Sequence, residues 1–325
     1  MRVLLRSAGS LALILVAACG ANASTSEAPL LTASAAASGG SMNTGGGGAA
    51  SVSSTGAGGV FEGPIGGDRP VIVSAPPDYD PNVPAPLLLL LHGYSGSGDV
   101  QELYLDLDKE AASRGYLFAH PDGTKDKNGL EFWNATDACC DFGNSGIDDS
   151  TYLAKVIAQI TQTFNVDPKR IHLMGHSNGA FMAHRMACDH ADAIASIAAL
   201  SGAQFLDLNQ CKPSEAVNTL VIHGTLDPII LYAGGNLFGH AYPGPVDTAK
   251  DWVHLNGCDP KVNENLPPRD LTQVLGAETK VMRWSGCENK TVVEHWRIEG
   301  SGHLPLFKQS FKTALFDFFD GHPKP

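Results

Sequence analysis

Short apolar runs alternate with longer amphipathic segments along most of this chain. Leu87–Leu91 is a run of five leucines, which is the pattern of a central strand covered on both faces. Further apolar runs predict strands at Val71–Ala75, Tyr116–His120, Arg170–Met174, Ile194–Leu200, Thr219–His223 and Thr291–Ile298. These strands are separated along the chain rather than joined by tight hairpins.

The segments between these runs have helical patterns. They predict helices at Val100–Arg114, Asp148–Phe164, Asn178–Cys188, Pro245–Asn256 and Pro305–Phe319, with a long loop from Pro121 to Gly146. Alternating strands and helices indicate an α/β fold whose mostly parallel central sheet has helices on both faces. In such sheets, functional residues gather in loops at the carboxyl ends of the strands.

The first 19 residues have the pattern of a bacterial export signal. Arg2 and Arg6 supply positive charge, and the apolar stretch Leu11–Ala18 follows. This stretch is too short for a good membrane span. Small residues directly precede Cys19, as in a lipobox, so we expect cleavage before Cys19 and lipidation of its thiol. A plain secretory signal is the alternative.

Composition changes sharply after the signal. Of the 40 residues from Gly20 to Gly59, 32 are Gly, Ala, Ser or Thr, which offer too little apolar surface to offset the entropy of ordering. We therefore expect a tether over residues 20–64 and one catalytic domain over residues 65–325. The net charge of −12 argues against nucleic acid or an anionic membrane surface as a partner. Any membrane contact would come through the lipid anchor.

Six of the seven cysteines lie in the predicted domain, and an even number in an exported domain suggests disulfides. The preferred pairs are Cys258 with Cys287 and Cys188 with Cys211, while Cys139–Cys140 bridge each other or reach elsewhere. A structural zinc at Cys188 and two nearby histidines, His184 and His190, is the alternative. No C-x-x-C pair accompanies them, so no metal is expected.

The sequence Gly175-His176-Ser177-Asn178-Gly179 carries the strongest chemical signal. A predicted strand precedes it and a predicted helix follows, which is the setting of a nucleophile elbow. The flanking glycines leave space for a tight turn that projects the serine hydroxyl. The alternative is an ordinary strand-to-helix turn with Ser177 as the N-cap.

A serine nucleophile needs a histidine base, and that base needs a carboxylate to orient it. Asp227 follows the strand Thr219–His223, and His303 follows the last strand, so both are expected at carboxyl ends. Their order along the chain is serine, acid, histidine, as the elbow fold requires. Asp207 is the reserve candidate for the acid.

The oxyanion of the tetrahedral intermediate needs two backbone N–H donors. Asn178 directly follows the nucleophile and is expected to supply one. The glycine-rich loop after Leu87–Leu91 is expected to supply the other through Tyr94, since Gly93 lets the backbone approach the substrate.

Taken together, these motifs resemble the secreted α/β-hydrolases of the polyhydroxybutyrate depolymerase and feruloyl esterase group, often lipoprotein esterases. The resemblance spans roughly residues 67–319. It is carried by Leu91-His92-Gly93, His120-Pro121-Asp122-Gly123-Thr124, Phe132-Trp133-Asn134, Ile147-Asp148-Asp149, the Ser177 pentapeptide, His223-Gly224-Thr225-Leu226-Asp227 and Gly302-His303. It implies an α/β-hydrolase fold and a Ser177–His303–Asp227 triad that hydrolyses carboxylic esters without metal or organic cofactor.

Two side chains bear on the substrate. Leu304 follows His303 where the family usually has tryptophan, which alters the acyl or alcohol pocket. Trp133 either stacks on a feruloyl or sugar ring or packs beneath its loop as a brace. Feruloyl, acetyl and hydroxyalkanoate esters, small or polymeric, all remain open as substrates. A serine peptidase on the same fold and a non-catalytic surface binding protein are the alternative functions.

Overall fold

The computed structural model describes residues 64–325. The predicted signal, the lipidation site Cys19 and all but the last residue of the predicted tether lie outside the described residues. Among the described residues, no helix is both long and apolar enough to span a bilayer.

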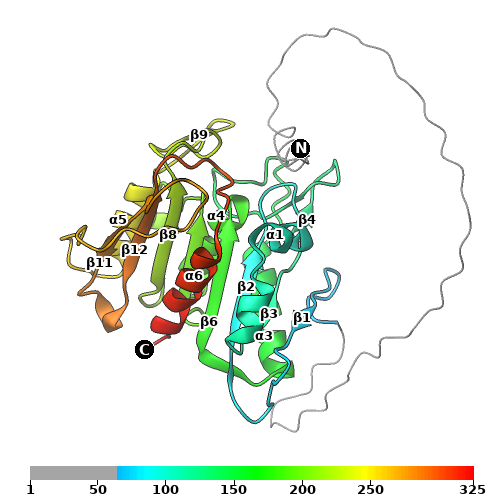
Figure 1. Cartoon of the computed structure of the whole chain (residues 1–325). Coiled ribbons are helices and arrows are strands. Elements are labelled where there is room, and N and C mark those ends of the chain that lie inside the picture. The colour runs from blue at the N-terminus through cyan, green and yellow to red at the C-terminus, as the bar shows by residue number, and fades with distance from the viewer. Residues whose placement is uncertain (1–63) are drawn as a thin grey trace, which may run out of the picture. The chain divides into compact units, whose positions relative to one another are not determined.

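An eight-stranded sheet forms the centre of this region, in the order β1-β3-β2-β6-β7-β8-β12-β11 (Figure 1). Its six inner strands are parallel: β3 (Leu117–Ala119), β2 (Ala85–Leu91), β6 (Val166–His176), β7 (Ser196–Leu200), β8 (Asn218–Gly224) and β12 (Val293–Ile298). The edge strands β1 (Val73–Ser74) and β11 (Thr279–Trp284) are antiparallel to their neighbours. The mostly parallel sheet expected from the alternating pattern is thereby confirmed.

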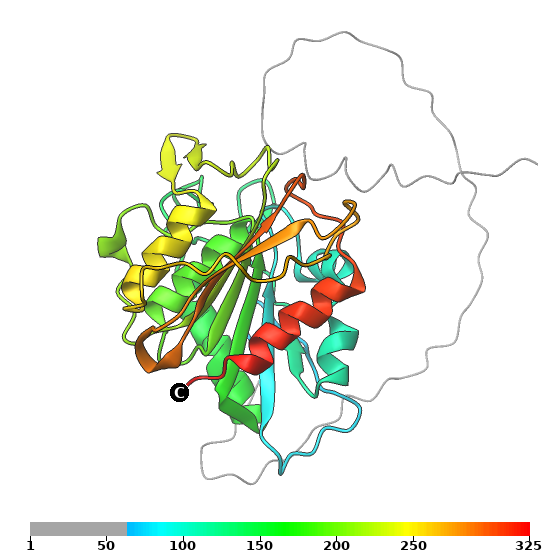
Figure 2. The ribbon, with the colours of Figure 1, turned by 60° about the vertical axis from the view of Figure 1, so that its left-hand side comes forward.

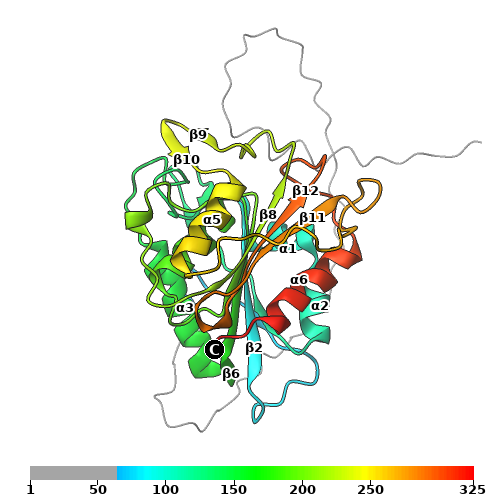
Figure 3. The same cartoon turned by 90° about the vertical axis from the view of Figure 1, so that its left-hand side faces the viewer.

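Helices cover both faces of the sheet (Figure 3). One face carries α3 (Asp149–Thr163), α4 (Asn178–Asp189) and α5 (Pro245–Leu255). The other carries α1 (Gly98–Leu105), α2 (Asp108–Ser113) and α6 (Gln309–Gly321), and Figure 2 shows α6 crossing that face.

The leucine run of β2 supplies both cores. Leu87, Leu89 and Leu91 belong to one hydrophobic cluster, whereas Leu88 and Leu90 belong to the other. Because successive side chains of a strand point to opposite faces, a strand between two helical layers needs an apolar residue at every position. All five leucines are fully buried.

The structure differs from the sequence prediction in several local elements. The predicted helix Val100–Arg114 is divided into α1 and α2, because Asp106 adopts a left-handed conformation with φ of 50°. β11 escaped prediction because it has exposed and half-buried positions rather than a continuous apolar run. Two short hairpins were also unpredicted: β4 (Thr124–Lys125) with β5 (Glu131–Phe132), and β9 (Gly235–Leu237) with β10 (His240–Tyr242).

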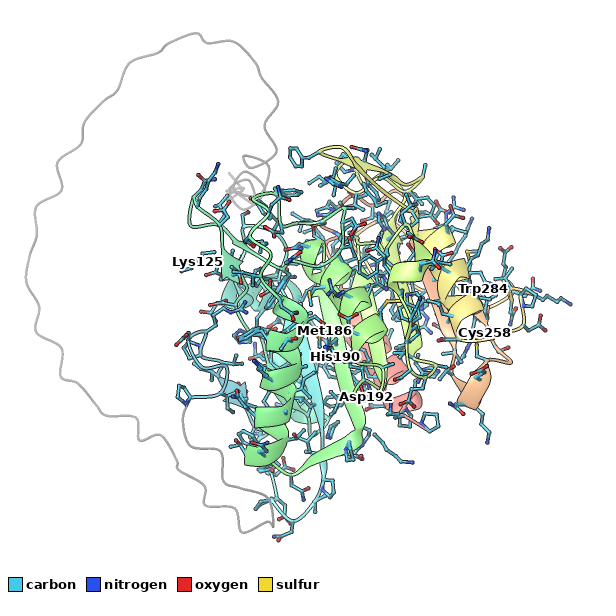
Figure 4. All side chains as sticks on the ribbon, turned by 180° about the vertical axis from the view of Figure 1, so that it is seen from behind. Lys125, Met186, His190, Asp192, Cys258 and Trp284 are labelled. Carbon is cyan, nitrogen blue, oxygen red and sulfur yellow. A yellow bond between two sulfur atoms is a disulfide. The ribbon has the colours of Figure 1, made fainter. Side chains whose placement is uncertain are left out.

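The preferred disulfides are confirmed. Cys188 is bonded to Cys211 and Cys258 to Cys287, and Cys139–Cys140 bridge each other. Figure 4 labels Cys258 together with Trp284, and both belong to or pack against the same hydrophobic cluster beside α5.

The zinc alternative is wrong, because Cys188 is consumed in a disulfide. His184 is fully buried and its Nδ1 accepts a hydrogen bond from Trp252 Nε1 at 2.9 Å. His190, just past the end of α4 (Figure 4), has its Nε2 3.0 Å from Ser150 Oγ. These contacts explain the histidines as packing and hydrogen-bonding residues.

Glu102 gives the folded domain a pH dependence that can be measured. Its Oε1 accepts a hydrogen bond from the backbone N–H of Asp108 at 2.9 Å, whereas its buried Oε2 has no partner among the described residues. Burial raises the pKa of Glu102 to about 7. The pKa of Glu102 in the unfolded chain is about 4.3, so the folded state binds its proton more tightly than the unfolded state. The stability that protonated Glu102 contributes is therefore complete below the unfolded pKa of about 4.3, and is lost as pH rises through about 7.

We therefore expect Glu102→Gln to become progressively more stable than the parent protein as pH rises from about 5 to about 8. Thermal unfolding across this range measures the difference in Tm. Glu264→Gln, at an exposed position, is the matched control. A Tm difference for Glu102→Gln that stays constant with pH would contradict this assignment.

Candidate active site

Ser177 occupies a sharp turn between β6, which ends at His176, and α4, which begins at Asn178. Its φ of 53° and ψ of −119° are unfavourable for a residue with a side chain. A Cβ at Gly175 would lie 2.0 Å from the carbonyl oxygen of Gly179, and one at Gly179 would lie 2.1 Å from that of Leu91. Both flanking positions therefore require glycine, as the elbow interpretation predicted.

Asp227 and His303 form a buried pair. Asp227 lies just after β8, and its Oδ2 is 2.8 Å from His303 Nδ1. Its Oδ1 accepts hydrogen bonds from the backbone N–H groups of Ile229 and Ile230, both at 2.9 Å. Asp227 is 4% exposed and His303 is 7% exposed, so the pair is largely shielded from water but still reachable at the imidazole.

The carboxylate of Asp227 is held in its charged form. Burial by itself would raise its pKa, but hydrogen bonds from His223 and His303 hold the pKa of Asp227 well below its usual range. His223 Nε2 is 3.4 Å from Asp227 Oδ2 and donates to the carbonyl oxygen of Ile230 at 2.7 Å. A charged Asp227 keeps the proton of His303 on Nδ1, which leaves Nε2 as the acceptor.

Asp207, the reserve acid, lies elsewhere. It is exposed, and its side chain accepts a hydrogen bond from the Asn209 backbone at the start of a short 3-10 helix, Leu208–Gln210. Of the two sequence candidates, the structure pairs Asp227 with His303.

His176 connects the nucleophile turn to the loop that carries His303. Its ring centroid is 5.0 Å from that of His303, and its Nε2 is 3.1 Å from the carbonyl oxygen of His303. Burial lowers the pKa of His176 to about 3, so the ring is neutral and donates a single hydrogen bond. Tyr104 on α1 also holds this loop, since its hydroxyl donates to the carbonyl oxygen of Pro305 at 2.9 Å.

Sequence reasoning missed these supporting residues. The motif assigns His176 only to the elbow, although a histidine at the end of an otherwise apolar strand is a signal that its side chain contacts another polar group. Tyr104 offered no such signal, because its partner Pro305 is distant along the chain.

The glycine-rich loop after β2 passes close to the nucleophile. A Cβ at Gly93 would lie 3.3 Å from Ser177 Cβ, and the Gly93 N–H donates to Gln101 Oε1 at 3.2 Å. Asn178 is the first residue of α4, where an α-helix has no internal acceptor for the backbone N–H. The oxyanion role of Tyr94 and Asn178 remains a prediction.

Buried side chains brace this loop from below. His92 Nδ1 is 2.8 Å from the carbonyl oxygen of Gly93, and its Nε2 accepts from the Gly123 N–H at 2.8 Å. Trp133 Nε1 donates to the carbonyl oxygen of His92 at 3.1 Å. The Asn178 side chain bonds the backbone N–H and carbonyl of Trp133 at 2.7 and 2.9 Å.

The prediction that Trp133 stacks on a substrate is therefore wrong. Its side chain is 0% exposed, so a substrate cannot reach it there. The alternative of a bracing tryptophan fits the structure. Leu304 is half-buried beside His303, and its substrate role remains a prediction.

The fold is that of an α/β-hydrolase. A glycine-flanked serine follows one inner strand of the sheet, and an Asp–His pair follows later strands. A solved acetyl xylan esterase from Aspergillus awamori has the same fold, with a TM-score of 0.56 at 14% identity over 77% of this chain and 93% of that protein. The chain belongs to the family described as "Putative esterase", whose model matches residues 63–228.

Two curated relatives are more similar to this chain in sequence than the solved acetyl xylan esterase is. Feruloyl esterase B of Piromyces equi is 29% identical over 72% of this chain and 42% of its own length. The bifunctional acetylxylan esterase/xylanase XynS20E of Neocallimastix patriciarum is 26% identical over 74% of this chain and 31% of its own length. The chain thus spans less than half the length of these two relatives.

Proposed function

We propose that this protein is a carboxylic ester hydrolase that acts through Ser177, His303 and Asp227. The observation that carries the proposal is the 2.8 Å contact between His303 Nδ1 and Asp227 Oδ2, in a loop whose backbone is hydrogen-bonded to the residue before Ser177. Nucleophile, base and acid thus come from the ends of β6, β12 and β8, at one edge of the sheet.

In the first half of the reaction, Ser177 Oγ attacks the ester carbonyl carbon while His303 Nε2 takes the hydroxyl proton. The N–H groups of Tyr94 and Asn178 stabilise the oxyanion. His303 then returns the proton to the leaving alkoxide, the C–O bond breaks, and an acyl-enzyme remains. In the second half, His303 activates a water that releases the acid and restores Ser177. Asp227 stabilises the imidazolium in both halves.

The relatives guide the choice of substrate. They are named as feruloyl and acetylxylan esterases, so we propose feruloyl or acetyl esters as the substrate class. A panel of methyl ferulate, acetylated xylan and hydroxybutyrate oligomers measures the preference, and the last of these tests the resemblance to polyhydroxybutyrate depolymerases.

We also propose that the protein is exported and attached to a membrane through lipidated Cys19, with residues 20–64 as a tether. Three disulfides among the described residues support export, because disulfides persist in oxidising compartments. Metabolic labelling with a fatty-acid analogue, compared between the parent chain and Cys19→Ala, tests the anchor.

The proposed mechanism is tested directly with a fluorophosphonate probe, which reacts with an activated serine. We expect a single adduct on Ser177 by peptide mass spectrometry, and much slower labelling in His303→Ala because the base is missing. Labelling of another serine, or equal rates in both proteins, would contradict the proposed roles.

A further inference from the structure

His223 is a fully buried histidine near the carboxyl end of β8. It follows three buried apolar residues of the same strand, Leu220, Val221 and Ile222. A buried imidazole costs free energy unless its nitrogens are hydrogen-bonded. An apolar side chain at this position would avoid that cost, so the contacts of the ring indicate what the histidine does here.

One ring nitrogen of His223 faces two hydrogen-bond acceptors. Its Nε2 is 2.7 Å from the carbonyl oxygen of Ile230 and 3.4 Å from Asp227 Oδ2. A carbonyl and a carboxylate oxygen can only accept, so Nε2 carries a proton that it shares between them. The other nitrogen, Nδ1, is buried and has no hydrogen-bond partner among the described residues. The hydrogen bonds of the ring thus all lie on the side of Asp227.

These contacts hold both oxygens of the Asp227 carboxylate. Oδ1 accepts from the backbone N–H of Ile230, while the carbonyl oxygen of Ile230 accepts from His223. The segment that binds Oδ1 is therefore fixed at both of its backbone polar groups. Oδ2 lies 2.8 Å from Nδ1 of His303, and it is the same oxygen that His223 faces. His223 and His303 therefore share one oxygen of Asp227.

The titratable neighbours of these three residues in the described part of the chain include two histidines and three tyrosines, namely His176, His295, Tyr104, Tyr232 and Tyr242. Burial lowers the pKa of His176 to about 3 and that of His295 to about 4. Burial also raises the pKa of each tyrosine above its usual value. All five side chains are thus uncharged near neutral pH.

Two charged side chains lie on the β12 side of His223. Arg297 is the register partner of His223, and its guanidinium lies 5.5 Å above the ring of Tyr232. Its Nε is 3.1 Å from Oε1 of Glu299, so the two charges compensate each other. The charge that His303 meets is therefore mainly that of Asp227.

We propose that His223 is a positioning residue of the active site, whose Nε2–H group holds the Asp227 carboxylate and limits the charge that it presents to His303. This inference rests on the proposed triad. Because Asp227 shares its charge between two ring donors, it stabilises the imidazolium of His303 less than an unshared carboxylate would. His303 therefore stays able to accept the Ser177 proton to a lower pH than it would without His223.

His223→Phe tests this role, because it removes the donor and keeps an aromatic ring. We measure the pH at which kcat/KM for p-nitrophenyl acetate falls to half of its plateau on the acid side, which reports protonation of the base. We expect this midpoint to rise by about half a pH unit or more, since Asp227 then holds a proton on His303 more tightly. His223→Gln places an amide N–H near the position of Nε2 and should restore the midpoint of the parent protein.

His295→Phe is the matched control. It makes the same substitution at a fully buried histidine of β12, the strand beside β8 (Figure 3). The ring nitrogens of His295 contact the Val221 carbonyl and the Tyr232 hydroxyl, so its loss should lower Tm without moving the midpoint. An unchanged midpoint in His223→Phe, or an equal shift in His295→Phe, overturns the proposal.

Nitrogen NMR of the labelled imidazole rings tests the contact in the parent protein without substrate. We expect the proton of His223 on Nε2 and that of His295 on Nδ1, because Nδ1 of His295 faces the Val221 carbonyl. Loss of the signal in His223→Gln assigns it. A proton on Nδ1 of His223 with Nε2 bare overturns the proposal, even where His223→Phe fails to fold. Absence of ester hydrolysis by the parent protein, with the proton on Nε2, contradicts the proposed function rather than this contact.

Discussion

Ser177→Ala should lower kcat for ester hydrolysis by about four orders of magnitude or more. The hydroxyl is the nucleophile of the proposed mechanism, and methyl cannot replace it, so any residual rate would come from water attacking a bound ester. Such a loss corresponds to about 5–6 kcal/mol of transition-state stabilisation. Hydrolysis of p-nitrophenyl acetate by the purified proteins measures it.

Two controls accompany this substitution. Ser214→Ala removes an exposed serine and should leave the rate within about twofold of the parent. Thermal unfolding of Ser177→Ala should show an intact fold, because alanine accepts the same packing at this turn. If Ser177→Ala hydrolyses the ester as fast as the parent protein, Ser177 is not the nucleophile.

Asp227→Asn should lower kcat by about 10⁴, comparable with the loss known for serine proteases. The Asn Oδ1 still accepts from the Ile229 and Ile230 N–H groups, so we expect the loop to keep its conformation. Its NH₂ then points at His303 Nδ1 and forces the proton onto Nε2. In that tautomer His303 cannot accept the Ser177 proton.

The matched control is Asp207→Asn, at the exposed reserve position. We expect its kcat to stay within about twofold of the parent. Steady-state kinetics on the same ester, with circular dichroism to verify folding, separates the two aspartates. A large loss in Asp207→Asn together with normal kinetics in Asp227→Asn would transfer the acid role to Asp207.

The local sequence pattern was sufficient to predict an element where the pattern itself reveals which of its faces are buried. The continuous leucines of β2 and the alternation of strands and helices predicted a parallel sheet, because a strand between two helical layers has no polar face. The glycine spacing around Ser177 predicted the turn, since the clashes that exclude side chains there are local. The preferred disulfides were also predicted correctly.

Residues whose surroundings come from distant segments were predicted less well. Trp133 has an aromatic ring in a long loop, a pattern that fits a stacking platform as well as a brace, and only the fold reveals His92 and Asn178 around it. The break between α1 and α2 depends on the backbone conformation of Asp106, which the helical pattern does not encode.

The sequence by itself determined the class of fold, the candidate nucleophile and base, and two candidates for the acid. It did so because strand order along the chain predicts which strand ends carry functional loops. The tertiary structure decided that Asp227 rather than Asp207 pairs with His303, and that His176 and Tyr104 hold the loop that carries the base. Each of these is a contact between segments far apart in sequence, whose distance is set only when the sheet and its loops have packed.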